Sequence, residues 1–168
     1  MACRDTSREA AREAAREAAA DSLARKLTYR MHLLHKLTDQ ESQRRYLEDA
    51  GLSLSDGRCL STIGAFEPIS VNALAQMANL NKAQASRAAQ ALVDQGLVDK
   101  AGSASDGRGV QLTLTARGRK AWTRVMELID RRNEEIFGCL SASEQQVLSD
   151  LFDRLIDHAR GAEADPEA

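Results

Sequence analysis

The stretch from Val71 to Thr115 limits what this chain can fold into more than any other. An apolar face at helical spacing follows Ser70, a good N-cap residue, and stops at residues 79–81, which are Asn-Leu-Asn. Asparagine tolerates the left-handed backbone of a helix end, and Asn81 can cap a new helix with Gln84 reaching back to it. Two helices that meet at a turn of about three residues predict a helix-turn-helix.

The second helix, expected from Lys82 to about Gln95, carries donor-rich side chains near its start. Side chains of these kinds contact base edges and phosphates, and they are Lys82, Gln84, Ser86, Arg87 and Gln90. Gly96 is expected to end this helix, and residues 97–100 to form a short strand. A loop of small residues then precedes the strict alternation of residues 110–115, which predicts a half-buried strand. The pattern therefore predicts a β-wing with Arg108 near its tip.

The run from Asp106 to Gly118, lying after residues 81–87, resembles the multiple-antibiotic-resistance regulator (MarR) family. The family's wing signature is an Asp-x-Arg, an apolar-alternating strand and a Leu-Thr-x-x-Gly entry to the next helix, all of which this chain contains. The resemblance extends in element order from about Leu23 to Arg160. It implies a mainly α fold with a small β-wing, a winged helix-turn-helix with N- and C-terminal dimerisation helices, and a DNA-binding regulator without enzymatic activity.

The flanking segments complete the expected organisation, with Ser53 and Thr115 each expected to cap the helix that follows and Ser141 with Glu144 expected to form a capping box. We expect a charged, Ala-rich helical arm over 1–20, a dimerisation helix over 21–50, a winged helix-turn-helix DNA-binding domain over 51–118, connecting and C-terminal dimerisation helices over 119–160, and an acidic tail over 161–168. Large apolar side chains recur at helical spacing from Leu23 to Leu37 and from Val147 to Ile156, and one subunit would not cover them. The sequence therefore predicts a homodimer.

The arm contains three copies of Arg-Glu-Ala-Ala, beginning at Arg8, Arg12 and Arg16. Beyond Cys3, alanine is its only apolar residue, so the favoured interpretation is a solvated helical extension. The alternative is an arm that reaches DNA or the partner subunit.

Charge is segregated along the chain, although the net charge is only −2. Residues 79–124 carry eight basic and three acidic side chains, whereas residues 125–168 carry four basic and eleven acidic ones. Neutralising DNA phosphates releases counterions and supplies affinity. The basic middle segment is therefore the one expected to face DNA.

The resemblance implies that the partner is double-stranded DNA with a pseudo-palindromic operator. Together with the residue chemistry, it suggests a role for individual side chains at this interface. We expect Arg108 to enter the minor groove, with Asp106 holding the wing or a nearby arginine in place. Lys82 is expected to contact phosphate. Arg87 is the best candidate for reading a base, although it could equally hold a phosphate or pair with Asp106.

The resemblance also implies repression relieved by a small-molecule effector, bound where the first, second and long helices converge. Basic and aromatic side chains that could approach an anionic ligand there are His32, His35, Arg58 and Trp122. Two histidines three positions apart fall short of a zinc site, so no metal or cofactor is expected.

Two other functions remain open. One branch of the family senses peroxide through a reactive cysteine, which here would be Cys59, Cys139 or Cys3, although scattered thiols are usually reduced and inert. The second alternative is a winged helix that binds proteins and has lost DNA binding.

The sequence argues against an enzyme and against a membrane protein. It has no phosphate-binding glycine loop, no His-Glu-x-x-His motif and no nucleophile elbow. No apolar run approaches the roughly 18 residues of a membrane span, and the first residues lack the apolar core of a secretory signal. We expect the chain to be cytoplasmic.

Overall fold

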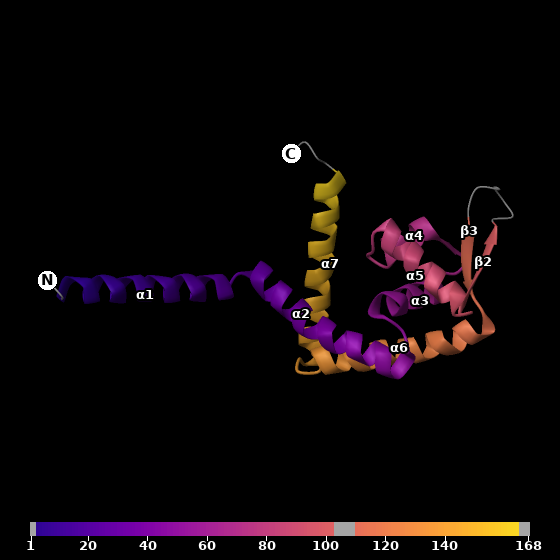
Figure 1. The fold of residues 1–168 in the computed structure, drawn as a ribbon, viewed down its shortest axis with the longest axis horizontal. Helices are drawn as coiled ribbons and strands as arrows, with labels where there is room; N and C mark the ends of the chain where they lie inside the picture. The colour runs from indigo at the N-terminus through magenta and orange to yellow at the C-terminus, as the bar shows by residue number, and fades with distance from the viewer. Residues whose placement is uncertain (1–2, 103–109, 165–168) are drawn as a thin grey trace. The chain divides into compact units, whose positions relative to one another are not determined.

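The structure is a computed structural model that describes residues 3–102 and 110–164 (Figure 1). The chain divides into two compact units, Met1–Arg45 and Tyr46–Ala168. Within the described ranges, no helix has the length and apolar character needed to cross a membrane.

The first unit consists of two helices, α1 (Cys3–Ala24) and α2 (Leu27–Arg45). The break between them lies at Arg25 and Lys26, later than the expected boundary at residue 20, because residues 18–24 contain no helix breaker. None of the residues of α2 is buried within this chain, and its leucines are exposed. Hydrogen bonds from Arg44 and Arg45 lower the pKa of Glu41 to about 2.

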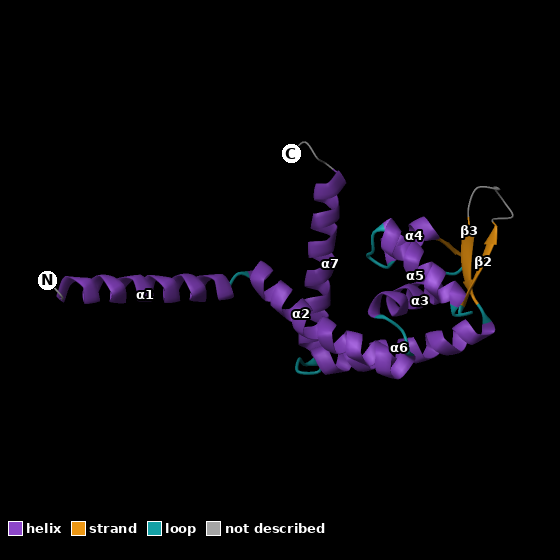
Figure 2. Cartoon of the chain, viewed as in Figure 1, coloured by secondary structure: helices purple, strands orange, loops and turns teal. Residues whose placement is uncertain are grey.

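The second unit contains a winged helix-turn-helix followed by two long helices (Figures 1 and 2). This unit begins with a short π-helical turn, η1. The elements of the second unit are, in chain order, η1 (Tyr46–Ala50), α3 (Leu54–Phe66), β1 (Ile69–Ser70), α4 (Val71–Met77), α5 (Lys82–Asp94), β2 (Val98–Gly102), β3 (Val110–Leu114), α6 (Ala116–Phe137) and α7 (Ala142–Ala164). The expected mainly α fold with a small β-wing is confirmed.

The sheet has three antiparallel strands in the order β1-β3-β2. Strand β1 was not predicted, because two residues are too few to show an alternating pattern. The predicted end of β2 at Lys100 is wrong, because pairing with β3 carries the strand on to Gly102 opposite Val110.

The core of the second unit lies where α3, α4 and α5 meet the sheet and α6. Its largest fully buried side chains are aliphatic and include Leu60, Ile63, Leu74, Leu92, Leu112 and Leu128. Glycines let two aromatic rings approach α3: a Cβ on Gly57 would meet the Tyr46 ring at 2.2 Å, and one on Gly64 would meet Trp122 at 2.3 Å. These contacts attach both η1 and α6 to α3.

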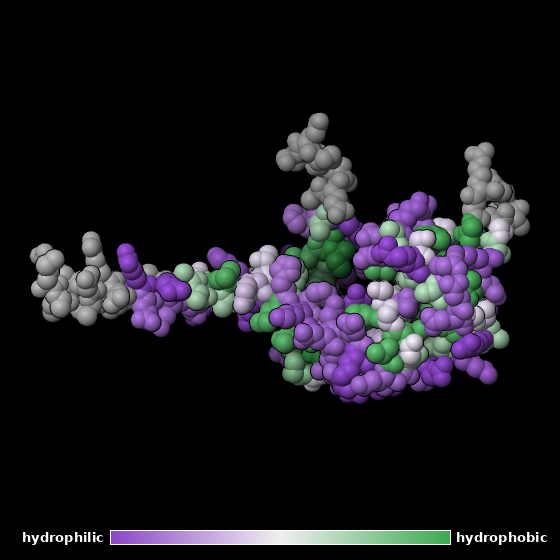
Figure 3. Space-filling model, in the orientation of Figure 1, coloured by the Kyte–Doolittle hydropathy of each residue, from purple (hydrophilic) through white to green (hydrophobic). Residues whose placement is uncertain are grey.

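Helix α7 begins with the expected capping box, in which Ser141 N donates to Glu144 Oε2 at 2.8 Å and Ser141 Oγ accepts from the Glu144 amide. Large apolar side chains along α7 are between 42% and 63% exposed, namely Val147, Leu151, Phe152, Leu155 and Ile156. Figure 3 shows apolar surface, in green, gathered over this helix. The second unit itself therefore does not cover this apolar face of α7.

Candidate nucleic-acid interface

The start of α5 has the geometry of a recognition helix. Asn81 Oδ1 accepts from the Gln84 amide at 2.9 Å, and Gln84 Oε1 accepts from the Asn81 amide at 3.1 Å, so the predicted capping box is present. Asn79 has a φ of 53°, the left-handed backbone that asparagine tolerates and that turns the chain from α4 into α5. The first turn of α5 is therefore fixed by its own sequence.

Helix α5 has a buried face of small residues and an exposed face of polar ones. Alanines on the buried face let α5 pack closely against α3 and α4, together with Leu92. All five candidate DNA-contacting side chains of α5 are exposed, namely Lys82, Gln84, Ser86, Arg87 and Gln90. Arg87 and Lys82 have no hydrogen-bond or ion-pair partner among the described residues. The exposed face can therefore donate to base edges and phosphates.

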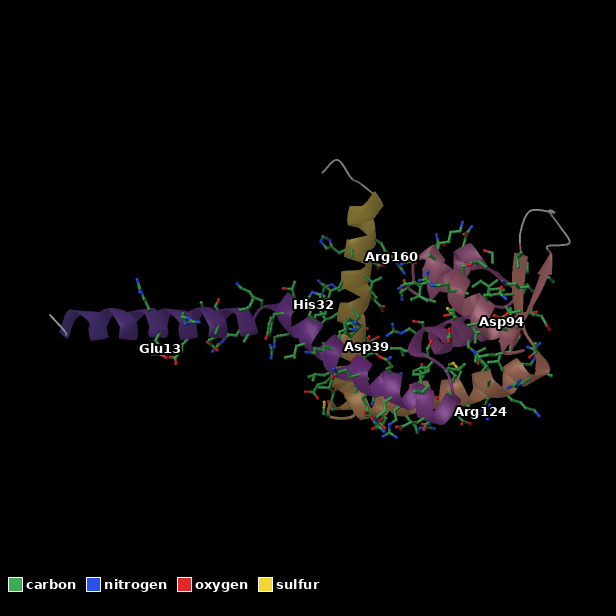
Figure 4. The ribbon with its side chains drawn as sticks, viewed as in Figure 1. Glu13, His32, Asp39, Asp94, Arg124 and Arg160 are labelled. Atoms are coloured by element: carbon green, nitrogen blue, oxygen red, sulfur yellow. The ribbon has the colours of Figure 1, made fainter. Side chains whose placement is uncertain are left out.

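Gln90 differs from the other four because both the oxygen and the nitrogen of its side-chain amide form hydrogen bonds within the protein. Gln90 Oε1 accepts from Lys100 Nζ on β2 at 2.5 Å, and Gln90 Nε2 donates to Asp94 Oδ1 at 2.7 Å. Asp94 is labelled at the end of α5 in Figure 4. No sequence pattern predicts this contact, since a lysine on a strand and a glutamine on a helix meet only in the tertiary fold.

The two strands of the wing pair in a regular register, with Lys100 opposite Leu112 and Gly102 opposite Val110. Asp106 and Arg108, the predicted wing-positioning and minor-groove residues, lie outside the described residues. The described strands thus provide the base of the wing that carries them.

The end of α5 is joined tightly to the start of α6. The carbonyl oxygen of Leu97 accepts from the Thr115 amide at 3.0 Å, and Thr115 Oγ1 donates to the Gly96 carbonyl at 2.8 Å. Thr115 Oγ1 also accepts from the Gly118 amide at 2.8 Å and so caps α6, as predicted. Arg117 Nη1 donates to the Gln95 carbonyl at 3.1 Å. These contacts give a physical reason for the Leu-Thr-x-x-Gly pattern.

Glu67 makes a second connection, between the end of α3, the sheet and α6. Its carboxylate accepts from the Leu114 amide at 2.5 Å and forms an ion pair with Arg119. Burial alone would raise the pKa of Glu67, but the Leu114 hydrogen bond and the Arg119 guanidinium together lower it below its usual value of 4.5. Glu67 is a site that the sequence analysis missed.

The proposed effector residues lie on three helices. His32 and His35 are on α2 in the first unit, where Figure 4 labels His32 and Asp39, and His35 Nε2 is 3.3 Å from Asp39 Oδ2. Arg58 and Trp122 are in the second unit on α3 and α6, and Trp122 Nε1 donates to the Ser61 carbonyl at 3.2 Å. No group of three or more His, Cys, Asp or Glu side chains suited to a metal ion occurs in the described part of the chain.

A pocket of about 370 Å³ that the sequence analysis did not foresee lies between α6 and α7. It is lined by both polar and apolar side chains, including Asn133, Glu134, Phe137, Gln145, Leu148 and Phe152. The pocket depends on the direction in which α7 leaves the end of α6, which the sequence pattern of either helix does not specify.

Cys59 has the environment of a structural rather than a reactive cysteine. It is fully buried in the core, and burial, with a smaller contribution from Asp56, raises the pKa of its thiol to about 11. Because the thiolate is the reactive form, a pKa this high leaves Cys59 unreactive at neutral pH. Cys139 is exposed at the end of α6.

Comparisons with known proteins agree with this geometry. The model of the MarR family matches residues 50–109. The transcriptional repressor Rv2887 of Mycobacterium tuberculosis is 28% identical over 109 residues, which cover 65% of this chain and 78% of that protein.

Two solved structures extend the likeness to the fold. Rv2887 in complex with p-aminosalicylic acid has a TM-score of 0.62 at 25% identity, covering 77% of this chain and 98% of that one. A MarR/EmrR family transcriptional regulator from Acinetobacter sp. ADP1 has a TM-score of 0.76 at 19% identity, covering 83% of this chain and 98% of that one. Members of this family are regulators that bind DNA and are not enzymes. Its capped recognition helix, the paired strands of its wing and these relatives make the chain similar to the MarR family of winged helix-turn-helix transcriptional regulators, whose model matches residues 50–109.

Proposed function

We propose that the chain is a homodimeric, ligand-responsive repressor that binds a pseudo-palindromic operator in double-stranded DNA. The observation that carries the proposal is the start of α5, where exposed donor side chains follow a capping box and the opposite face is buried on the domain. A helix so oriented can place Gln84, Ser86 and Arg87 against base edges while Lys82 meets phosphate.

The wing supplies the second contact with DNA. Arg108 enters the flanking minor groove, whose negative potential attracts a guanidinium, and Asp106 holds the wing or a nearby arginine in position. This part of the proposal is supported by the sequence signature and by the paired strands that lead into the loop.

Dimerisation is supported by the exposed apolar side chains of α2 and α7. Their leucines, phenylalanine and isoleucine would each contribute about 1.5–3 kcal/mol on burial against a second copy. Two recognition helices related by a two-fold axis then enter successive major grooves, about one helical turn apart.

Relief of repression by a small anionic effector is supported by relatives. Solved structures of Rv2887 contain p-aminosalicylic acid and salicylic acid, which are aromatic carboxylates. In this chain the side chains proposed to bind such a ligand are Arg58 and Trp122 of the second unit and, separately, His32 and His35 of the first. The ligand shifts the spacing of the two DNA-binding domains only as far as it prefers one spacing over the other. We place this regulation in the cytoplasm.

Selection of bound duplexes from a random DNA pool tests the proposal. The expected result is enrichment of a two-fold symmetric site, bound by two chains and released by salicylate or a related carboxylate. A pool that shows no enrichment after several rounds, while the protein remains folded, would contradict DNA recognition and favour a protein-binding winged helix.

A further inference from the structure

The base of the wing is tied to the recognition helix by a chain of three side chains. Lys100 on β2 donates to the amide oxygen of Gln90 on α5, and the Gln90 amide nitrogen donates to Asp94 one turn later. The cation on one side and the carboxylate on the other fix the orientation of the Gln90 amide, because only its oxygen can accept from Lys100 and only its nitrogen can donate to Asp94.

The strand register explains why Lys100 points toward α5. Lys100 lies opposite Leu112 in the antiparallel pair, so both side chains lie on the same face of the sheet. Leu112 on that face is fully buried, and so is Val98, two positions before Lys100. Gly102, two positions after it, has no side chain. Lys100 is therefore the last residue of β2 whose side chain can hold the wing against the domain.

Charge balance argues against a simple phosphate contact by Lys100. Its ammonium group faces an amide oxygen whose own nitrogen is bonded to the Asp94 carboxylate, so the local charge of the group is close to zero. Lys82 and Arg87, by contrast, have no such partners among the described residues. The free cations of α5 are thus the better phosphate ligands.

We propose that Gln90, held between Lys100 and Asp94, is a positioning residue that sets the angle between the wing and α5. This angle determines the distance between major-groove and minor-groove contacts at which the protein binds DNA. The inference rests on the proposed DNA-binding function and deepens it. A wing held at one angle contacts DNA without first losing conformational freedom. Both the affinity for DNA and the selectivity for the spacing of the two contacts therefore depend on the Lys100–Gln90–Asp94 hydrogen bonds, the tether of the wing.

The test uses full-length protein and an operator obtained by selection, with variants in which the A·T-rich flank is moved by one base pair. Gln90→Met removes both hydrogen bonds without changing charge, and Lys100→Met removes the donor. Gln90→Glu combined with Asp94→Asn is the matched rescue variant, because a carboxylate at position 90 accepts from Lys100 and from the new amide at position 94, and net charge is unchanged.

Each methionine variant should lose roughly three- to tenfold in affinity, the value of one or two exposed hydrogen bonds, and combining them should add little. Both should discriminate less between the original and shifted operators, and the rescue variant should recover discrimination. The slope of log affinity against log salt should stay constant in all variants. A slope reduced by about 0.9 in Lys100→Met, with Gln90→Met unchanged, would instead make Lys100 a phosphate ligand and overturn the inference.

Hydrogen exchange in the protein without DNA separates this inference from the function on which it rests. Amides of residues 98–102 should exchange faster in Gln90→Met than in wild type or in the rescue variant. If wild type binds no operator, the proposed function fails while the exchange comparison still tests the tether. If the exchange rates of these amides are unchanged in Gln90→Met, the inference that Gln90 holds the wing is wrong, regardless of the result of the DNA-binding measurements.

Discussion

Gly118 and Leu97 touch backbone to backbone: a Cβ added to Gly118 would lie 1.9 Å from the carbonyl oxygen of Leu97. The same carbonyl accepts from the Thr115 amide, so the chain leaving α5 and the first turn of α6 share one compact joint. Because α6 continues from this joint toward α7, the recognition helix is coupled through backbone contacts to α7, one of the two helices proposed to form the dimer.

Gly118→Ala should therefore destabilise the protein, because two backbone segments must separate to admit the methyl group. We expect a loss of about 1–3 kcal/mol in the free energy of unfolding, measured by urea denaturation. Gly161→Ala is the matched control, since Gly161 is also helical and has no atom within 4 Å of its added Cβ. The control should be neutral or slightly stabilising, and equal losses in both variants would contradict the close-contact account.

Asn81→Ala tests whether the cap of α5 matters for DNA binding beyond stability. Loss of an N-cap costs about 0.5–2 kcal/mol. Ser53→Ala removes the cap of α3, where Ser53 Oγ accepts from the Asp56 amide at 3.1 Å, and should cost a similar amount. At temperatures where both variants are folded, only Asn81→Ala should weaken operator binding in an anisotropy titration. Equal affinities would show that the first turn of α5 is not at the interface.

Glu67→Gln should make unfolding less dependent on pH. The pKa of Glu67 is lowered in the folded protein, so its stabilising contribution is complete above the usual value of 4.5 and is lost as the pH falls through the lowered folded-state pKa. The wild type should therefore be more stable than the variant at about pH 7, with the difference shrinking at about pH 3. A difference that stays constant across this range would mean that Glu67 acts by packing alone.

Arg108→Ala should reduce operator affinity severely while leaving the dimer and its melting temperature unchanged. Removing a guanidinium from a narrow minor groove loses both its attraction to the negative potential of the groove and its contacts with the groove walls. Arg124→Ala is a control of equal charge change, because Arg124 is an exposed residue of α6 with no partner among the described residues (Figure 4). Similar affinity losses in the two variants would show that net charge, and not the wing, is responsible.

Lys82→Ala and Arg87→Ala should separate phosphate contact from base contact. Lys82→Ala should weaken all sequences alike and reduce the salt slope by about 0.9. Arg87→Ala should relax preference at one position in each half-site, at a cost of about 1–3 kcal/mol for the preferred base. Competition titrations with single-base operator variants distinguish the two patterns, and uniform weakening by Arg87→Ala would make it a second phosphate ligand.

The sequence predicted those parts of the fold that depend on neighbouring residues. The caps at Ser53, Asn81, Thr115 and Ser141 are local chemistry, and each is present. The left-handed Asn79 and the glycine after α5 also follow from residue type. Contacts between distant segments could not be predicted this way, because a pattern within one element does not specify its partner.

The residues that sequence analysis missed at the interface are all of this second kind. Glu67 bonds Leu114 and Arg119, and Lys100 bonds Gln90, across segments that only the fold brings together. Gln90 is exposed on α5, as its helical position predicts, but the sequence of α5 alone does not predict its bond to Lys100. The break between α1 and α2 was misplaced because no residue near position 20 marks it.

Affinity for the selected operator, measured by anisotropy at several salt concentrations against a scrambled duplex of the same length, tests whether the exposed face of α5 recognises DNA. We expect saturation at two chains per operator, a large preference over the scrambled duplex and a linear fall of log affinity with log salt. Equal affinity for the two duplexes, or binding that does not respond to salt, would contradict the assignment of the exposed α5 face to DNA.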